Sequence, residues 1–374
     1  MRVRRILPSH LSVVVAALLL LSVQHGRAEQ SFGLEDAGRR DPVALINGAM
    51  GTDAGALIWG RAVTAKGLDH GTPDEGLWKK FQRTFRIFTP KKLKHRAVIV
   101  EIFNRETQRT ESHRVMTDKY GNFELRLEGH DLKDLATGAH PIAAKVEGKS
   151  FAVAASTGRL RIYPRKGTLV VSDIDDTILD TRVNQRLKMI KKVLFSNAHD
   201  LRTFAGASGL FQAFGDQGFP TIFVTSSPSN LDTRLGAFLK LNGFPAKLPL
   251  LMKTLGKDKF SGDHGSYKQG QLAKVMGLFG GYKVVAIGDS GQADQQIYET
   301  LRNRLGDERV RFIAIRRVPR VPAKGYAGQF LFDDYAEAHR RLETSRILPT
   351  TTKKRTTLTR TRQPLTARMK RTRR

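Results

Sequence analysis

Residues 168–177 read TLVVSDIDDT, and this stretch decides the fold. An apolar, β-branched run leads into the carboxylates of Asp173, Asp175 and Asp176 and a threonine. Such a run is typical of a buried parallel strand, and ligands gather beyond the carboxyl ends of these strands in open α/β sheets. Crowded carboxylates repel one another, so the segment needs a cation, a shared proton or a solvated loop. The simpler interpretation is a strand that ends in an acidic turn.

A second apolar run ends in hydroxyl residues. Residues 221–228 read TIFVTSSP, so Thr225 and the two serines follow a predicted strand. Hydroxyls and loop N–H groups at a strand end can hold a phosphate oxygen. The alternative interpretation is that these residues cap the next helix, which Pro228 would start well. The two interpretations are compatible.

A third apolar run ends in glycine and carboxylates. Residues 283–294 read KVVAIGDSGQAD. Glycine lets a loop approach a ligand closely, and Asp289 and Asp294 offer the oxygen ligands that Mg²⁺ prefers. An ordinary Gly-Asp turn is the simpler interpretation.

Lys268 lies between the second and third runs, at the start of a predicted helix. Its ammonium group could bind a phosphate or a carboxylate. The simpler interpretation is a solvated surface charge, as most lysines are.

In this order, the four segments resemble the motifs of the haloacid dehalogenase superfamily of phosphotransferases. Residues 173–177 match its first motif, DxDx(T/V). Thr225 matches the second motif, Lys268 the third, and Gly288-Asp289 with Asp294 the fourth. The order of the motifs is right, and each acidic or hydroxyl motif follows an apolar run.

The resemblance implies a division of roles among these residues. Asp173 would attack phosphorus to form an aspartyl-phosphate, and Asp175 would act as general acid and base. Thr225 and Lys268 would hold the transferring phosphate. The Mg²⁺ ligands would be Asp173, the main-chain carbonyl of Asp175 and Asp289. Asp294 would orient the water ligands of the ion or bind it directly. Thr177 would brace the loop, and no superfamily-wide role falls to Asp176.

Residues 167–317 also resemble a narrower group, the phosphatidate phosphatase family first known from the yeast actin patch. This likeness rests on the sequence segments SDIDDT, TSSP and GDSGQAD. It implies hydrolysis of phosphatidate to diacylglycerol and phosphate. One departure bears on lipid specificity, because the family usually has an aromatic residue after Ser-Pro and this chain has Ser229-Asn230.

The amino terminus predicts export. Arginines at positions 2, 4 and 5 precede an apolar run over residues 11–23, and small residues follow at 26 and 28. This pattern is typical of a secretory signal peptide, here residues 1–28. An uncleaved anchor is the alternative, although the run is short for a spanning helix. The chain has no cysteine, which excludes disulfides, thiol catalysis and thiolate metal sites. We expect a periplasmic or secreted protein.

The charge of the chain is concentrated at its end. The formal net charge is +29, and residues 344–374 hold 11 Lys and Arg and no Asp or Glu. This Thr/Arg-rich tail lacks an apolar period and is predicted to be disordered. It favours anionic surfaces, so we expect peripheral contact with an anionic membrane, or simply a solubilising tail. No dedicated nucleic-acid site is predicted.

The chain is predicted to fold as two domains. After a loosely structured segment at 29–53, short alternating runs over 54–164 predict a small antiparallel β domain, a sandwich. Strands and helices then alternate over 165–343, which predicts an α/β domain with a doubly wound parallel sheet of the haloacid dehalogenase-like kind. The strands are expected at 168–172, 220–225, 283–287 and 309–315, and the helices at 185–195, 207–217, 230–241, 268–279 and 293–304.

Three functions are compatible with these observations. The first is a Mg²⁺-dependent lipid phosphate phosphatase, and the second is an exported phosphatase for soluble phosphomonoesters such as nucleotides or sugar phosphates. The third is a non-enzymatic protein that binds through its β domain and basic tail. The intact motif residues argue against the third, whereas Ser229 and the predicted export keep the second open.

Overall fold

The computed structural model of the chain describes residues 40–66, 68, 91–148, 156–180, 201–254, 256, 258, 264–323 and 325–350, with the backbone of 5–6. The predicted signal peptide lies outside the described residues except for that short strand. The helix expected at 185–195 and the basic segment beyond residue 350 also lie outside them.

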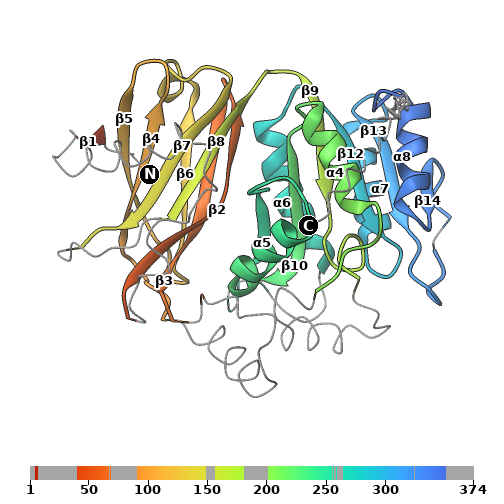
Figure 1. The fold of residues 1–374 in the computed structure, drawn as a ribbon, viewed down its shortest axis with the longest axis horizontal. Coiled ribbons are helices and arrows are strands. Elements are labelled where there is room, and N and C mark those ends of the chain that lie inside the picture. The colour runs from red at the N-terminus through yellow and green to blue at the C-terminus, as the bar shows by residue number, and fades with distance from the viewer. Residues whose placement is uncertain are drawn as a thin grey trace, which may run out of the picture.

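The first part of the chain forms one eight-stranded sheet, the β domain (Figure 1). Its strands follow the order β1-β5-β4-β7-β8-β2-β3-β6, and the sheet curls so that β5 and β6 contact each other. The strand bounds are β1 (Arg5–Ile6), β2 (Pro42–Thr52), β3 (Gly55–Thr64), β4 (Ala97–Asn104), β5 (Arg109–Met116), β6 (Asn122–Glu128), β7 (Gly138–Val146) and β8 (Ser156–Tyr163), with a 3₁₀ turn η1 at Gly129–Asp131.

Two expectations for this domain need correction. The sheet is mixed, because β2 and β8 pair in parallel while its other pairs are antiparallel. Strand β2 also lies inside the segment predicted to be loosely structured. Small residues hide the strand pattern there: a Cβ at Gly48 would lie 2.1 Å from the Trp59 ring, so glycine is required beneath that indole.

The second part of the chain forms a six-stranded sheet in the order β11-β10-β9-β12-β13-β14. Every pair in it is parallel, which confirms the predicted α/β architecture. The strand bounds are β9 (Gly167–Ser172), β10 (Thr221–Pro228), β11 (Leu250–Lys253), β12 (Tyr282–Asp289), β13 (Val310–Arg316) and β14 (Gln329–Phe332). The helix bounds are α4 (Ala207–Asp216), η2 (Ser229–Leu231), α5 (Asp232–Leu241), α6 (His264–Leu278), α7 (Asp294–Leu305) and α8 (Tyr335–Thr344).

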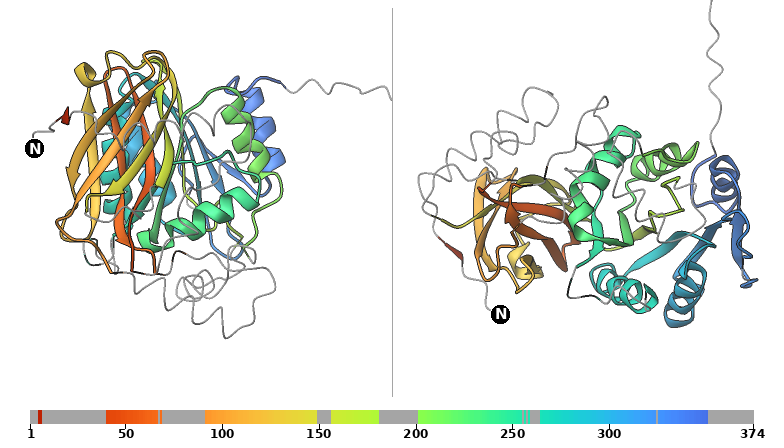
Figure 2. Two further views of the ribbon diagram at one scale, coloured as in Figure 1. Left: turned by 60° about the vertical axis from the view of Figure 1, so that its left-hand side comes forward. Right: turned by 90° about the horizontal axis from the view of Figure 1, so that it is seen from below.

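Helices cover both faces of this parallel sheet (Figure 2). Apolar side chains of α4, α5 and α8 pack on one face with Val170 of β9. Those of α6 and α7 pack on the other face with Leu169 and Val171. Successive residues of a strand point to opposite faces, so the apolar side chains of β9 pack against the helices on both faces of the sheet. This is why the sequence of β9 is continuously hydrophobic.

The two sheets meet along β11 and α6. Met50, Leu57 and Trp59 of the β domain belong to the same apolar cluster as α6 and α7, and Trp59 Nε1 donates to the carbonyl of Leu250 at 2.9 Å. Arg61 of β3 forms a buried bidentate ion pair with Asp232, the first residue of α5, with both N–O distances at 2.6 Å. The contact is therefore a packed interface rather than a loose linker.

The parallel-sheet domain extends past the boundary predicted at residue 343. After α8 ends at Thr344, Leu348 is buried in the apolar cluster beside α4 and α8, and Ile347 packs against it. The parallel-sheet domain therefore includes these residues. Within the described residues, no helix is both long enough and apolar enough to cross a membrane.

Candidate active site

The predicted acidic segment leaves the carboxyl end of β9, in the middle of the parallel sheet. The N–H of Asp173 still donates to the carbonyl of Ile287 on β12 at 3.0 Å, so the neighbouring strand fixes the start of the loop. Asp176 then adopts a left-handed backbone with φ +57°, which turns the chain sharply. Two side chains hold this turn: Arg316 Nε donates to the Asp176 carbonyl at 2.7 Å, and Tyr335 Oη donates to the Thr177 carbonyl at 2.8 Å.

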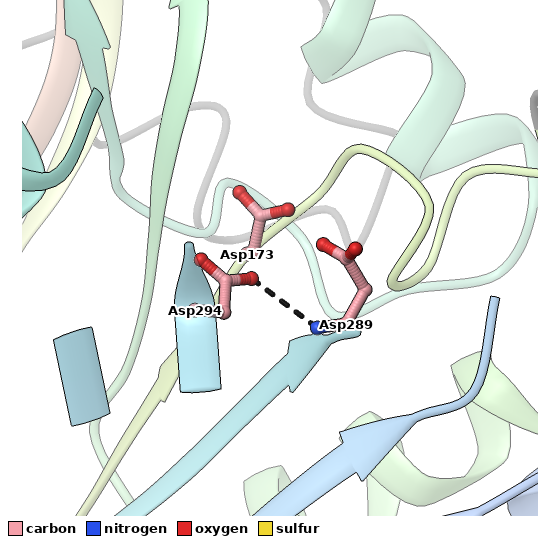
Figure 3. Close-up of side chains that lie close together, drawn as sticks. All are labelled: Asp173, Asp289 and Asp294. Carbon is pink, nitrogen blue, oxygen red and sulfur yellow. Dashed lines mark hydrogen bonds between the residues drawn. The ribbon is translucent and has the colours of Figure 1, made fainter. Parts of the chain in front are cut away.

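Three carboxylates gather beyond β9 and β12 (Figure 3). Asp173, Asp289 and Asp294 are all buried, and one oxygen from each lies within 4.8 Å of the others. The N–H of Asp289 donates to Asp294 Oδ2 at 3.2 Å, which fixes Asp294 at the start of α7 against the end of β12. The strand order β9-β12 thus places the first and fourth motifs side by side.

Lys268 of α6 neutralises part of this cluster. Its Nζ donates to Asp173 Oδ1 at 2.7 Å and to Asp294 Oδ1 at 2.6 Å, and its side chain is buried. Burial lowers the pKa of Lys268, but the carboxylates of Asp173 and Asp294 raise it by more, so the pKa lies above its usual value. The ammonium group is therefore retained despite burial.

The remaining oxygens of the cluster suit a divalent cation. Asp173 Oδ2 and Asp289 Oδ2 are buried and have no hydrogen-bond partner among the described residues. Burial raises the pKa of Asp173 and of Asp289 well above the usual value, with neighbouring carboxylates adding to the effect and Lys268 opposing it. A hard cation with oxygen ligands would satisfy both orphaned atoms and offset the repulsion, so these residues fit a metal ion.

Asp175 points toward β10 rather than toward this cluster. Its Oδ2 accepts hydrogen bonds from Thr225 Oγ1 at 2.7 Å and from Ser227 Oγ at 2.9 Å, whereas its buried Oδ1 has no partner among the described residues. Burial raises the pKa of Asp175, and the two hydroxyl donors partly oppose that shift. Two carboxylates only two residues apart therefore have different environments.

Gly288 is a steric requirement of the site. A Cβ at this position would lie 2.6 Å from Asp294 Cβ and 2.8 Å from the Tyr298 ring. Since real Cβ atoms do not approach other atoms so closely, a larger residue would displace Asp294. Glycine at this position was expected to let the loop approach a ligand closely. In the structure it lets the Asp294 side chain lie close to the backbone.

The structure brings together the six site residues expected from the sequence. They are Asp173, Asp175, Thr225, Lys268, Asp289 and Asp294. Two residues expected to hold the phosphate have protein partners: Lys268 donates to two carboxylates, and Thr225 donates to the Asp175 side chain. Ser227 was one of the hydroxyl residues noted but was not assigned a role, and Arg316 and Tyr335 were missed because no local pattern surrounds them.

Comparison with known proteins finds a likeness between these residues and one family. Residues 168–317 match the family described as the catalytic domain of phosphatidate phosphatase APP1. This part of the chain is similar to that catalytic domain. The recognition made from the motifs is thereby confirmed, and the matched segment contains all six site residues.

Two curated relatives match parts of the chain. An uncharacterised protein of Schizosaccharomyces pombe is 26% identical over 139 residues, which are 37% of this chain and 23% of the relative. Phosphatidate phosphatase APP1 of Saccharomyces cerevisiae is 26% identical over 222 residues, 57% of this chain and 36% of the relative. The matches therefore span only about a quarter to a third of the length of these relatives.

Solved structures show more distant likeness. A phosphoserine phosphohydrolase-like protein from Francisella tularensis is 14% identical, with a TM-score of 0.32, 47% of this chain covered and 99% of that chain. A class C acid phosphatase from Bacillus anthracis is also 14% identical, with a TM-score of 0.26, 37% of this chain covered and 62% of that chain.

Proposed function

We propose that the chain is a Mg²⁺-dependent phosphatase of lipid phosphomonoesters, which cleaves phosphatidate to diacylglycerol and phosphate. The proposal rests on two buried oxygens, one on Asp173 and one on Asp289, which have no hydrogen-bond partner among the described residues and lie beside a buried lysine. The segment that holds them matches the model of the phosphatidate phosphatase family. The haloacid dehalogenase-like fold is part of the same proposal, supported by the motif order and the parallel sheet.

Asp173 is the proposed nucleophile. Lys268 holds Asp173 Oδ1, so the lysine fixes the carboxylate, while Oδ2 has no hydrogen-bond partner among the described residues. An Asp173 oxygen attacks phosphorus, the ester P–O bond breaks, and an aspartyl-phosphate forms on Asp173. With a phosphate in place, the ammonium of Lys268 also faces the negative charge that the transferred group carries.

Asp175 is the proposed acid and base. Its raised pKa favours the protonated acid, and Oδ1 is the oxygen that remains unpartnered while Thr225 and Ser227 hold Oδ2. Asp175 gives its proton to the leaving alkoxide in the first step. It then takes a proton from water, which attacks phosphorus, breaks the Asp173–phosphate bond and releases phosphate.

The residues that would hold Mg²⁺ are Asp173, Asp289, Asp294 and the main-chain carbonyl of Asp175. The bound ion would neutralise charge on the phosphate oxygens and offset the repulsion between the carboxylates. Asp294 is the least available, because Lys268 and the N–H of Asp289 already occupy its two oxygens. An indirect role for Asp294, through water ligands, suits this arrangement.

Export to the periplasm or the medium, and contact with an anionic membrane through the basic tail, complete the proposal. A second candidate is an exported phosphatase for soluble phosphomonoesters. It is favoured by Ser229, which occupies the position where the family usually carries an aromatic residue.

Phosphate release distinguishes the two candidates. The mature protein is assayed with phosphatidate in mixed micelles and with nucleotide and sugar phosphates, each with Mg²⁺ and with excess chelator. We expect phosphatidate to be cleaved and chelator to stop the reaction. If full-length enzyme cleaves a nucleotide or sugar phosphate and leaves phosphatidate untouched, the lipid assignment is wrong. Cleavage that survives chelator would refute the metal assignment.

A further inference from the structure

We propose that the cleft between the two sheets binds the uncharged alcohol portion of the phosphomonoester, so that the β domain helps to choose the substrate. This inference rests on the proposed function, because it concerns what is attached to the phosphate. It assigns a binding role to the β domain.

The cleft is built by both sheets. Its volume is about 510 Å³, within the range of small-molecule sites. The β domain lines it with residues that include Trp59, Met116 and Asn122. The parallel-sheet domain lines it from β11 and α6, with residues that include Leu251, Thr254 and Gln271.

The cleft adjoins the phosphate side of the candidate active site. Ser229 lines it and follows Ser227, which binds Asp175, by two residues. Tyr267 lines it too and directly precedes Lys268. The strand order explains this position: a phosphate bound over β9 and β10 has β12 and the metal-binding carboxylates on one side, and β11 with the cleft on the other. A group attached to that phosphate therefore has the cleft beside it.

The charges of the cleft disfavour an anionic occupant. Among the described residues, Arg61 and Lys274 line it together with His95, against the carboxylates of Asp118, Glu124 and Asp258. Arg61 is committed to its buried pair with Asp232, and Lys274 forms an ion pair with Glu124. The described lining therefore has no surplus of Lys and Arg over carboxylates, in a chain of formal net charge +29. A second phosphate, as in a nucleoside diphosphate, finds no unpaired Lys or Arg among these residues.

The remaining lining suits an alcohol with apolar and hydrogen-bonding parts. Trp59, Met116 and Leu251 offer apolar surface, while Thr254 and Gln271 offer hydrogen-bonding groups at the same walls. A glycerol ester has this combination of chemistry. By contrast, a cavity of about 340 Å³ at the amino ends of β10 and β11 is lined by Arg159, Arg161 and Lys247, with no carboxylate among its described lining residues. It lies away from the catalytic strand ends.

The test fills the cleft from each wall separately. Met116→Trp adds bulk from the β domain, and Gln271→Trp adds bulk from α6. Arg159→Trp is the matched control, because it adds bulk to the cavity at the amino ends of β10 and β11. Each protein is assayed for kcat/KM on soluble dihexanoyl phosphatidate and on methyl phosphate, which has almost no alcohol portion. Calorimetry measures the binding of dihexanoylglycerol, which requires no catalysis.

Both filling variants should lower the ratio of kcat/KM for dihexanoyl phosphatidate over methyl phosphate by at least about tenfold, and weaken dihexanoylglycerol binding to match. The Arg159→Trp protein should keep the wild-type ratio and binding. If wild-type enzyme cleaves these esters but the folded filling variants keep the wild-type ratio, the cleft inference is overturned and the proposed function stands. If no ester is cleaved but dihexanoylglycerol binding depends on the cleft, the proposed function fails and the binding site survives. Absence of both overturns both.

Discussion

Asp173 and Asp175 are two residues apart, yet they meet different partners. Asp173 binds an ammonium group through one oxygen, whereas Asp175 binds two hydroxyls. Burial raises the pKa of both carboxyls, but the chief opposing group is the Lys268 ammonium at Asp173 and the pair of hydroxyls at Asp175. A carboxylate held by an ammonium suits a nucleophile, and a buried carboxyl held by hydroxyls suits a proton donor. The roles that we propose for Asp173 and Asp175 follow from these different hydrogen-bond partners.

Removing the nucleophile should abolish activity. Asp173→Asn is nearly isosteric but cannot form an acyl-phosphate, so phosphate release should fall by at least about 10³-fold. Measured on protein whose circular dichroism matches the wild type, a near wild-type rate would refute the role of Asp173.

Changing the acid and base should have a smaller effect. Asp175→Asn keeps the size of the side chain but removes the proton that Oδ1 would transfer, so kcat should fall by about 10²- to 10⁴-fold. Leaving groups that need no proton should lose less, so the deficit should shrink with an aryl phosphate of low leaving-group pKa. An equal deficit for alkyl and aryl esters would argue for a structural role only.

At the scale of elements, the sequence predicted the four inner strands of the parallel sheet and missed its short edge strands, β11 and β14. The apolar runs at β9, β10, β12 and β13 identified the parallel sheet and the loops that carry the site. β5 was missed because it reads RTESHRVM, with few apolar residues, and its place is set by pairing with β4. Such pairing depends on distant residues, so local periodicity does not contain it.

The same distinction applies to the site. The motif residues follow strand ends and could be predicted, whereas the residues that brace the Asp176 turn come from β13 and the start of α8. Arg316 also lies over the Phe204 ring, with its guanidinium carbon 3.7 Å from the ring centroid. These partners lie 140 and 158 residues from the loop they hold, and only the fold reveals them.

The end of β12 offers a steric test at this scale. Gly288→Ala should destabilise the protein by about 1–3 kcal/mol and weaken metal-dependent turnover, since the new Cβ would clash with Asp294. Gly209→Ala is the matched control: a Cβ at this α4 position has no atom within 4 Å, and alanine favours helices. Thermal denaturation and phosphate release measure both variants. Equal behaviour of the two proteins would contradict the proposed crowding.

At the scale of the whole molecule, a buried ion pair joins the two domains, and removing one of its partners should lower the free energy of unfolding. Arg61→Met leaves Asp232 uncompensated, so the free energy of unfolding should fall by about 3–5 kcal/mol. Arg165→Met is the control, because its pair with Asp53 is exposed and should contribute about 0–1 kcal/mol. Urea denaturation measures both. A loss of similar size in the two variants would show that the interface does not depend on Arg61.

The basic tail should strengthen binding to anionic membranes and should not affect turnover of a soluble substrate. Because Leu348 is buried, the truncation should remove residues 351–374 and keep the core intact. We expect weaker sedimentation with phosphatidate-containing vesicles and slower hydrolysis there, most of all at low salt, since a basic residue near such a surface contributes about 1 kcal/mol. Turnover of soluble dihexanoyl phosphatidate should barely change. A collapse of that turnover would show that the tail completes the site.

The central claim is that phosphate passes through a covalent bond to Asp173. The most direct measurement is acid quenching of the enzyme during turnover of radiolabelled dihexanoyl phosphatidate with Mg²⁺, followed by peptide mass analysis. We predict one labelled peptide, phosphorylated on Asp173, with the label absent from Asp173→Asn protein and released by hydroxylamine. Label on another residue, or rapid turnover without any labelled enzyme, would contradict the mechanism.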